Sequence, residues 1–76
     1  MKIGTKHPKN ESNLYRLRQL KGFTQQKMAD LLGISKGNYN QKENGKLDFN
    51  LVEVKKILQI LDEPYEVIFF EQNVTE

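Results

Sequence analysis

Two short helical patterns separated by only three residues constrain the fold of this chain more than any other feature of its sequence. The first pattern covers residues 25–32 and follows Thr24, which is a suitable N-cap. The second covers 36–43 and follows Ser35, which can cap it in the same way. Gly33 lies between them and can adopt the left-handed conformation that ends a helix. The two helices must therefore meet at a sharp bend.

The residues around this bend have the sizes that two closely packed helices require. Ala29 is small where the helices would cross, and Ile34 is placed to fill the angle between them. Gly33 takes a conformation that costs other residues about 1 kcal/mol or more. Tyr39, on the second helix, should point inward. This pattern predicts a helix-turn-helix.

The side of the second helix opposite Tyr39 carries amides, a lysine and a glycine. It comprises Lys36, Gly37, Asn40, Gln41 and Asn44. Amide side chains can both donate and accept hydrogen bonds, which matches the adenine edge in the major groove, and lysine can donate to guanine. A simply solvated helix face could have the same composition, and the amides alone favour that interpretation. Together with the bend and a basic half of the chain, they favour DNA recognition.

The net charge of +2 conceals a strong asymmetry along the chain. Residues 1–46 contain ten Lys and Arg against three acids, which gives +7, whereas residues 47–76 contain two Lys against seven acids, which gives −5. A compact domain with this distribution should turn its basic end to a polyanion and its acidic end away. Charges that merely solvate the surface are the alternative.

The chain before the bend should contain a basic segment and one helix. Residues 1–11 have no apolar periodicity and carry three lysines, so we expect a flexible basic N-terminal arm. Ser12 is a plausible N-cap for a helix that runs to about Lys21, with Leu14 and Leu17 on its buried side.

Two further helices are expected after the bend. Asn50 and Glu53 form a capping-box pattern that opens a fourth helix. Apolar residues at a 3–4 spacing define its expected buried side: Leu51, Val54, Ile57, Leu58 and Leu61. Pro64 fits the first turn of a short fifth helix. Its expected buried residues are Tyr65, Ile68 and Phe69.

The composition argues against an enzyme. The chain has no cysteine and a single histidine, His7, so thiolate chemistry and paired imidazoles are excluded. Ser12 and Ser35 have no identifiable histidine or lysine to activate them, and the acids lack metal-ligand spacing. We expect no catalytic residue, no metal, no cofactor and no small-molecule ligand. No run of residues suits a membrane span or a signal peptide, so we expect a cytoplasmic protein.

The segments that carry these patterns resemble the Cro and repressor (XRE) family of phage and bacterial helix-turn-helix regulators. The resemblance lies in the run TQQKMADLLGIS at 24–35, in Tyr39 and in the run ENGK at 43–46. It extends without a gap from about Leu14 to Phe69. It implies an all-α, five-helix, lambda-repressor-like domain that binds double-stranded DNA. We assign this domain to residues 12–70, followed by a C-terminal tail at 71–76.

The resemblance also implies roles for individual residues. Base contacts are assigned to Lys36, Gly37, Asn38, Asn40 and Gln41. Phosphate contacts are assigned to Gln25, Lys42, Asn44 and Lys46. The ion pair usual in the family maps onto Arg18 and Glu43, which would orient the second helix of the motif and not touch DNA.

Three departures from the family pattern limit what can be transferred. Gly37 stands where relatives commonly place a base-reading side chain, so its backbone or a neighbour such as Asn38 or Asn40 must serve instead. Lys42 occupies a position that is usually apolar, and its stem should lie along the core while its ammonium reaches solvent or phosphate. Leu20 and Leu31 fall at commonly polar positions and either widen the core, stay partly exposed or form a partner surface.

The expected function is transcriptional repression or switching by a homodimer that occupies an inverted-repeat operator, in a phage, prophage or mobile-element setting. The dimer interface is assigned to Tyr65, Phe69 and Phe70. Whether that contact pairs helices or adds a strand is open. An autoregulating antitoxin is one alternative, and a protein-binding adaptor that uses Leu20, Leu31 and Phe70 is the other.

Overall fold

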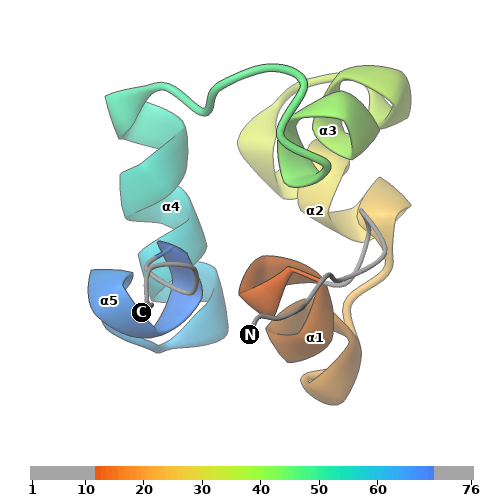
Figure 1. Ribbon diagram of the computed structural model, residues 1–76. Helices are drawn as coiled ribbons and strands as arrows, with labels where there is room; N and C mark the ends of the chain where they lie inside the picture. The colour runs from red at the N-terminus through yellow and green to blue at the C-terminus, as the bar shows by residue number, and fades with distance from the viewer. Residues whose placement is uncertain (1–11, 70–76) are drawn as a thin grey trace, which may run out of the picture.

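The computed structural model describes residues 12–69, and these residues form five α-helices and no strand. The helices are α1 (Asn13–Leu20), α2 (Gln25–Leu32), α3 (Lys36–Glu43), α4 (Leu51–Leu61) and α5 (Tyr65–Phe69). Helices α2 and α3 lie on one side of the molecule, α4 and α5 lie on the other, and α1 closes the space between them (Figure 1). The predicted order of five helices is confirmed. The predicted basic arm and tail, and Phe70, lie outside the described residues.

Side-chain caps begin the first four helices, as the sequence predicts. The side chains of Ser12, Thr24, Ser35 and Asn50 each accept a hydrogen bond from the backbone N–H three residues later. The capping box is complete, because the Glu53 side chain also accepts from the backbone N–H of Asn50 at 2.9 Å. Each cap satisfies an N–H group that the helix itself leaves unpaired.

The bend between α2 and α3 has the predicted left-handed residue. Gly33 has φ 75° and ψ 29°, and the backbone N–H of Ile34 donates to the carbonyl of Ala29 at 3.0 Å. This bond ends α2 and directs the chain into α3.

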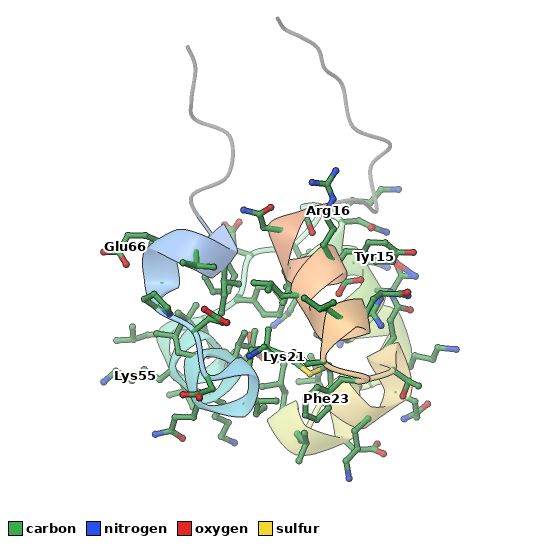
Figure 2. All side chains as sticks on the ribbon, turned by 90° about the horizontal axis from the view of Figure 1, so that it is seen from below. Tyr15, Arg16, Lys21, Phe23, Lys55 and Glu66 are labelled. Atoms are coloured by element: carbon green, nitrogen blue, oxygen red, sulfur yellow. The ribbon has the colours of Figure 1, made fainter. Side chains whose placement is uncertain are left out.

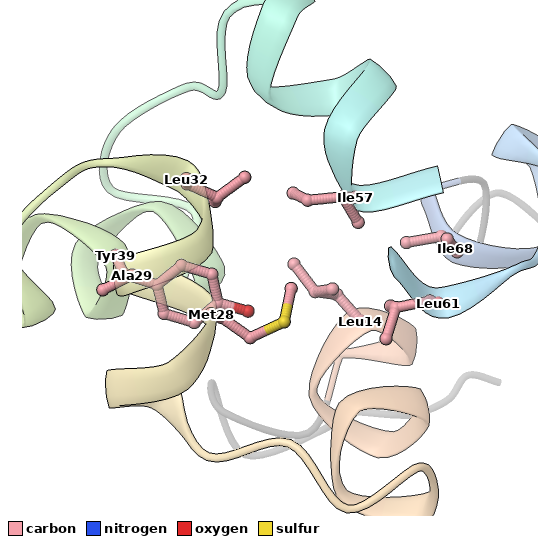
Figure 3. Packing of buried hydrophobic residues seen from close by; sticks show 8 residues of the cluster. All are labelled: Leu14, Met28, Ala29, Leu32, Tyr39, Ile57, Leu61 and Ile68. Atoms are coloured by element: carbon pink, nitrogen blue, oxygen red, sulfur yellow. The ribbon is translucent and has the colours of Figure 1, made fainter. Parts of the chain in front are cut away.

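The core lies where the two sides of the molecule meet (Figure 3). The buried apolar residues are Leu14, Met28, Ala29, Leu32, Tyr39, Ile57, Leu61 and Ile68. Leu14 of α1 lies between the residues of α2 and α3 and those of α4 and α5 (Figure 3). The core therefore holds the α2–α3 pair against the rest of the domain.

The loop before α4 supplies an aromatic link that the helical patterns do not indicate. The ring centroid of Phe49 lies 6.0 Å from that of Tyr39 and 6.0 Å from that of Phe69. Such tilted and edge-on aromatic pairs are favourable. Phe49 thus connects α3 to α5 across the core.

Two predicted core positions are wrong. Leu51 is 68% exposed, because it starts α4, where Glu53 takes the inward position of the first turn. Tyr65 is 50% exposed, and its ring leans on Phe69, with the centroids 5.2 Å apart. Leu17 lies only partly buried against the core.

No helix among residues 12–69 is long and apolar enough to cross a membrane.

Candidate nucleic-acid interface

One side of α3 is polar and open, and the other is fully buried. Tyr39 has no exposed surface, as predicted. The five residues assigned to base contacts are all at least partly accessible: Lys36, Gly37, Asn38 and Gln41 are exposed and Asn40 is half-buried. The fold therefore places these predicted residues on one short helix, and their individual base contacts stay predictions.

Gly37 leaves a bare patch of backbone on this helix. A Cβ atom built at Gly37 would meet nothing within 4 Å, so packing within the described residues does not require a glycine there. Glycine in a helix costs about 1 kcal/mol relative to alanine. The packing of the described residues does not explain this cost. A contact between α3 and another molecule would explain it.

A buried carboxylate fastens α3 to α1 and α2. Glu43 accepts from Arg18 Nε at 2.7 Å and from Arg18 Nη2 at 3.2 Å, so the predicted ion pair is present. Glu43 also accepts from Gln25 Nε2 at 3.0 Å and from the hydroxyl of Tyr39 at 2.8 Å. A further Arg18 nitrogen donates to the carbonyl of Phe23 at 2.9 Å. This network fixes the orientation of α3 in the domain.

Tyr39 and Arg18 both hold their protons in this network. Burial, followed by the charge of Glu43 and its hydrogen bond, raises the pKa of Tyr39, so the phenol stays a donor. Burial opposes ionisation of Arg18, but the hydrogen bond and charge of Glu43 outweigh it and raise the pKa of Arg18 above its ordinary value. Arg18 therefore stays a cation beside Glu43.

A second ion pair joins α3 to α4. Lys42 Nζ lies 2.7 Å and 2.9 Å from the two carboxylate oxygens of Glu53 and 5.9 Å from the ring centroid of Phe49. Burial disfavours the charged form of Glu53, but the hydrogen bonds from Lys42 and from the Asn50 backbone outweigh it and lower its pKa. The Lys42 stem lies along the core as predicted. Its ammonium meets a carboxylate of the same chain, a geometry that does not favour the predicted phosphate contact.

The other residues assigned to phosphate contacts are placed differently from one another. Gln25 opens α2 and donates its amide hydrogen to Glu43. Asn44, at the end of α3, donates from Nδ2 to Asn40 Oδ1 at 2.6 Å. Lys46 is exposed just beyond α3. Their phosphate contacts stay predictions.

A hollow of about 590 Å³ opens between α1, the start of α2 and α3. It brings together four residues predicted to contact DNA: Gln25, Lys36, Asn40 and Asn44. It also includes three that the sequence analysis missed: Tyr15, Gln19 and Gln26. Tyr15 lies on the side of α1 that faces away from α5 (Figure 2), with its ring centroid 5.1 Å from Arg18 Cζ. The i, i+4 spacing of Tyr15 and Gln19 shows that they share one side of α1, but no local pattern places that side beside α3.

Two of the three predicted dimer residues, Tyr65 and Phe69, lie on α5, at the opposite end of the domain from α3 (Figure 1). Tyr65 is half exposed, and Phe69 is half-buried against Phe49. Val67, which was not assigned to the interface, is also exposed. Elsewhere, Leu20 and Leu31 are exposed, so they do not widen the core.

Residues 12–69 contain no group of three or more His, Cys, Asp or Glu side chains that could hold a metal ion.

A family model described as helix-turn-helix matches residues 14–68. The SPbeta prophage-derived HTH-type transcriptional regulator YonR of Bacillus subtilis is 42% identical over 48 residues, which are 63% of this chain and 44% of YonR. The chain thus matches less than half the length of this relative. The crystal structure of the restriction-modification controller protein C.AhdI from Aeromonas hydrophila matches with a TM-score of 0.65 and 30% identity, over 75% of this chain and 83% of that one.

Proposed function

The chain belongs to the helix-turn-helix family, and from this premise we propose that it is a transcriptional regulator that reads double-stranded DNA with the exposed side of α3. The observation that carries the proposal is the composition of that side, which offers amides, a lysine and a bare glycine. A helix of this diameter fits the major groove, where amide and ammonium groups can pair with base edges.

The surroundings of α3 support the same orientation on DNA. The start of α2, where Gln25 lies, borders the same hollow as Asn40 and Lys36. Helix N-termini bind phosphate through their unpaired N–H groups, and Lys46 adds a positive charge at the other end of α3. The absent side chain at Gly37 lets a base or sugar approach the helix backbone. Phosphates on both sides of the groove would then position the reading helix.

The distribution of charge agrees with this orientation. The half of the sequence with net charge +7 contains α1 to α3, and the half with −5 contains α4 and α5. DNA attracts the first and repels the second, so α5 faces away from the duplex. That leaves α5 available for contact between two copies.

We therefore propose that two copies bind an inverted repeat and act as a repressor or switch by occupying it. One domain of this size reads only a few base pairs, and a two-fold dimer doubles the site. YonR is described as a prophage-derived regulator and C.AhdI as a restriction-modification controller, which supports a mobile-element or restriction-control setting. The proposal includes no chemical step.

A protein-binding adaptor is the second candidate, because Leu20 is 81% exposed and Leu31 is exposed as well. Those two side chains project from α1 and α2 and do not line the hollow beside α3. An adaptor would capture one protein in a manner that does not depend on salt, whereas DNA binding weakens steeply as salt rises. An autoregulating antitoxin would do both.

The proposed function is tested by selecting bound sequences from a random duplex pool. We expect enrichment of one inverted repeat, because a two-fold dimer presents the same reading helix twice. The matched control replaces Lys36, Asn40 and Gln41 by alanine, which removes the reading groups and leaves the buried side of α3 unchanged. A pool that shows no enriched sequence with the unaltered chain would contradict DNA recognition.

A further inference from the structure

Two asparagines one turn apart on α3 form a hydrogen-bonded pair at the edge of its reading side. Asn44 Nδ2 donates to Asn40 Oδ1 at 2.6 Å, and both residues line the hollow beside α1. Asn44 is half-buried at the C-terminal cap of α3, whereas Asn40 lies among the residues assigned to base contacts. Both residues are half-buried, and the bond runs from the C-terminal cap of α3 to a residue assigned to base contacts.

The amide of Asn44 is directed at a neighbouring side chain. Its Oδ1 is buried and has no hydrogen-bond partner among the described residues. An amide oxygen is an acceptor and cannot bind a phosphate oxygen, which is also an acceptor. Of the two hydrogens on its Nδ2, one is engaged by Asn40. Only the second hydrogen is left as a side-chain donor for a phosphate.

We propose that Asn44 is a positioning residue, which orients the amide of Asn40 so that Asn40 reads an adenine. This inference rests on the proposed function. An amide oxygen has two lone pairs, and Asn44 takes only one of them. Asn40 keeps the second lone pair and its Nδ2 hydrogens, which are the groups that pair with N6 and N7 of adenine.

The energetic reason is preorganisation. A free asparagine rotates its amide and must be immobilised when it binds a base, whereas an amide already held by a neighbour loses less entropy. Asn38 provides the contrast on the same helix. Its backbone N–H is bound to Ser35, but its exposed side chain has no hydrogen-bond partner among the described residues. Only Asn40 of these two amides is oriented before DNA arrives.

The test measures base preference and general affinity separately. The base pair read by Asn40 is identified first, as the one whose preference disappears in Asn40→Ala. Asn44→Ala should then lower the preference for adenine at that pair about three- to tenfold and leave affinity for random DNA and its salt slope unchanged. Alanine is tolerated at position 44 because φ there is −83°, in the ordinary right-handed region.

Two double variants complete the design. In the Asn40→Ala background, Asn44→Ala should change no base preference, because the amide that it positions is gone. In the Asn38→Ala background, the effect of Asn44→Ala should persist in full. Equal losses on selected and random DNA would overturn the inference and assign Asn44 to phosphate. Base selection that Asn40→Ala leaves unaltered would overturn it too. A chain that selects no sequence at all would instead defeat the proposed function.

Discussion

The carboxylate of Glu43 is buried and receives hydrogen bonds from Arg18, Gln25 and Tyr39. Only Arg18 among these partners brings a compensating positive charge. A buried charge that loses its partner is strongly destabilising, whereas replacing both members of a pair costs much less. The stability of the α1–α3 contact therefore depends on one arginine.

Arg18→Met should lower the free energy of unfolding by about 3–5 kcal/mol, because it leaves the Glu43 charge buried with neutral donors only. Lys27→Met, at an exposed position of α2, should change it by about 0.5 kcal/mol or less. Urea unfolding measures both. Adding Glu43→Gln to Arg18→Met should recover part of the loss. Strictly additive effects of the two substitutions would show that the pair is not coupled.

Exposed residues next to α3 should divide into those that read bases and those that bind phosphate. Gln41→Ala should weaken binding to the selected site by about 1–3 kcal/mol and scarcely affect random DNA. Lys46→Ala should weaken binding to every sequence and reduce the salt slope by about one unit. Titrations of both DNAs at several salt concentrations measure this. A new preferred sequence in Lys46→Ala would contradict its assignment.

At the scale of helices, the pair formed by Lys42 and Glu53 is the ionic link between α3 and α4 among the described residues. Lys42→Met should lower the free energy of unfolding by about 3 kcal/mol, because Glu53 would stay buried without its cation. The salt slope of DNA binding should not change, in contrast to Lys46→Ala. A reduction of that slope by one unit would instead make Lys42 a phosphate contact.

The same pair makes stability depend on pH. Since hydrogen bonds from Lys42 and Asn50 lower the pKa of Glu53 below its ordinary 4.5 in spite of burial, its stabilising contribution is present above pH 4.5 and is lost as pH falls through the folded-state pKa. Urea midpoints measured from pH 6 downward should fall less steeply in Glu53→Gln than in the unaltered chain. If the two curves are parallel below pH 4.5, Glu53 does not contribute to the pH dependence of stability.

The elements that local sequence determines could be predicted, and those that tertiary placement determines could not. The caps at Thr24 and Ser35 and the left-handed Gly33 depend on neighbours within a few residues, so their patterns were sufficient. Glu53 is different, because its capping role is visible in the sequence but its bond to Lys42 appears only when α3 and α4 pack together. The burial predicted for Leu51 is wrong for the same reason, because a periodic apolar pattern does not show where a helix extends beyond the helices that pack against it.

The candidate site shows the same division. Which residues share the exposed side of α3 follows from helical geometry and was predictable. That Tyr15 of α1 borders the same hollow depends on how α1 crosses α3, which no local pattern specifies. The bond from Asn44 to Asn40 lies within one helix, but an i, i+4 amide pair predicts only proximity and not which group donates.

At the scale of the whole molecule, the proposed reading side lies on α3 and the proposed dimer side lies on α5. Helix α5 presents Tyr65 and Val67 to solvent, and Asn13 Nδ2 donates to the carbonyl of Val67 at 3.1 Å, which fixes α5 against α1. Exposed apolar side chains on a fixed helix suit a two-fold contact. Because Phe69 is half-buried against Phe49, changing it would disturb the monomer as well. Tyr65 and Val67 are therefore the better positions to test.

The last prediction is that Tyr65→Asp and Val67→Asp each prevent dimerisation and leave the monomer folded, because both side chains are exposed and a charge there meets its own copy across a two-fold axis. Leu20→Asp, at a position 81% exposed on α1, is the matched control and should remain dimeric. Sedimentation with and without the selected inverted repeat measures the outcome. The dimer should space its two α3 helices about 34 Å apart, one turn of duplex, so monomeric variants should bind the full repeat only as weakly as a half-site. If the unaltered chain is a monomer in both conditions and selects one asymmetric half-site, two copies of α5 do not meet.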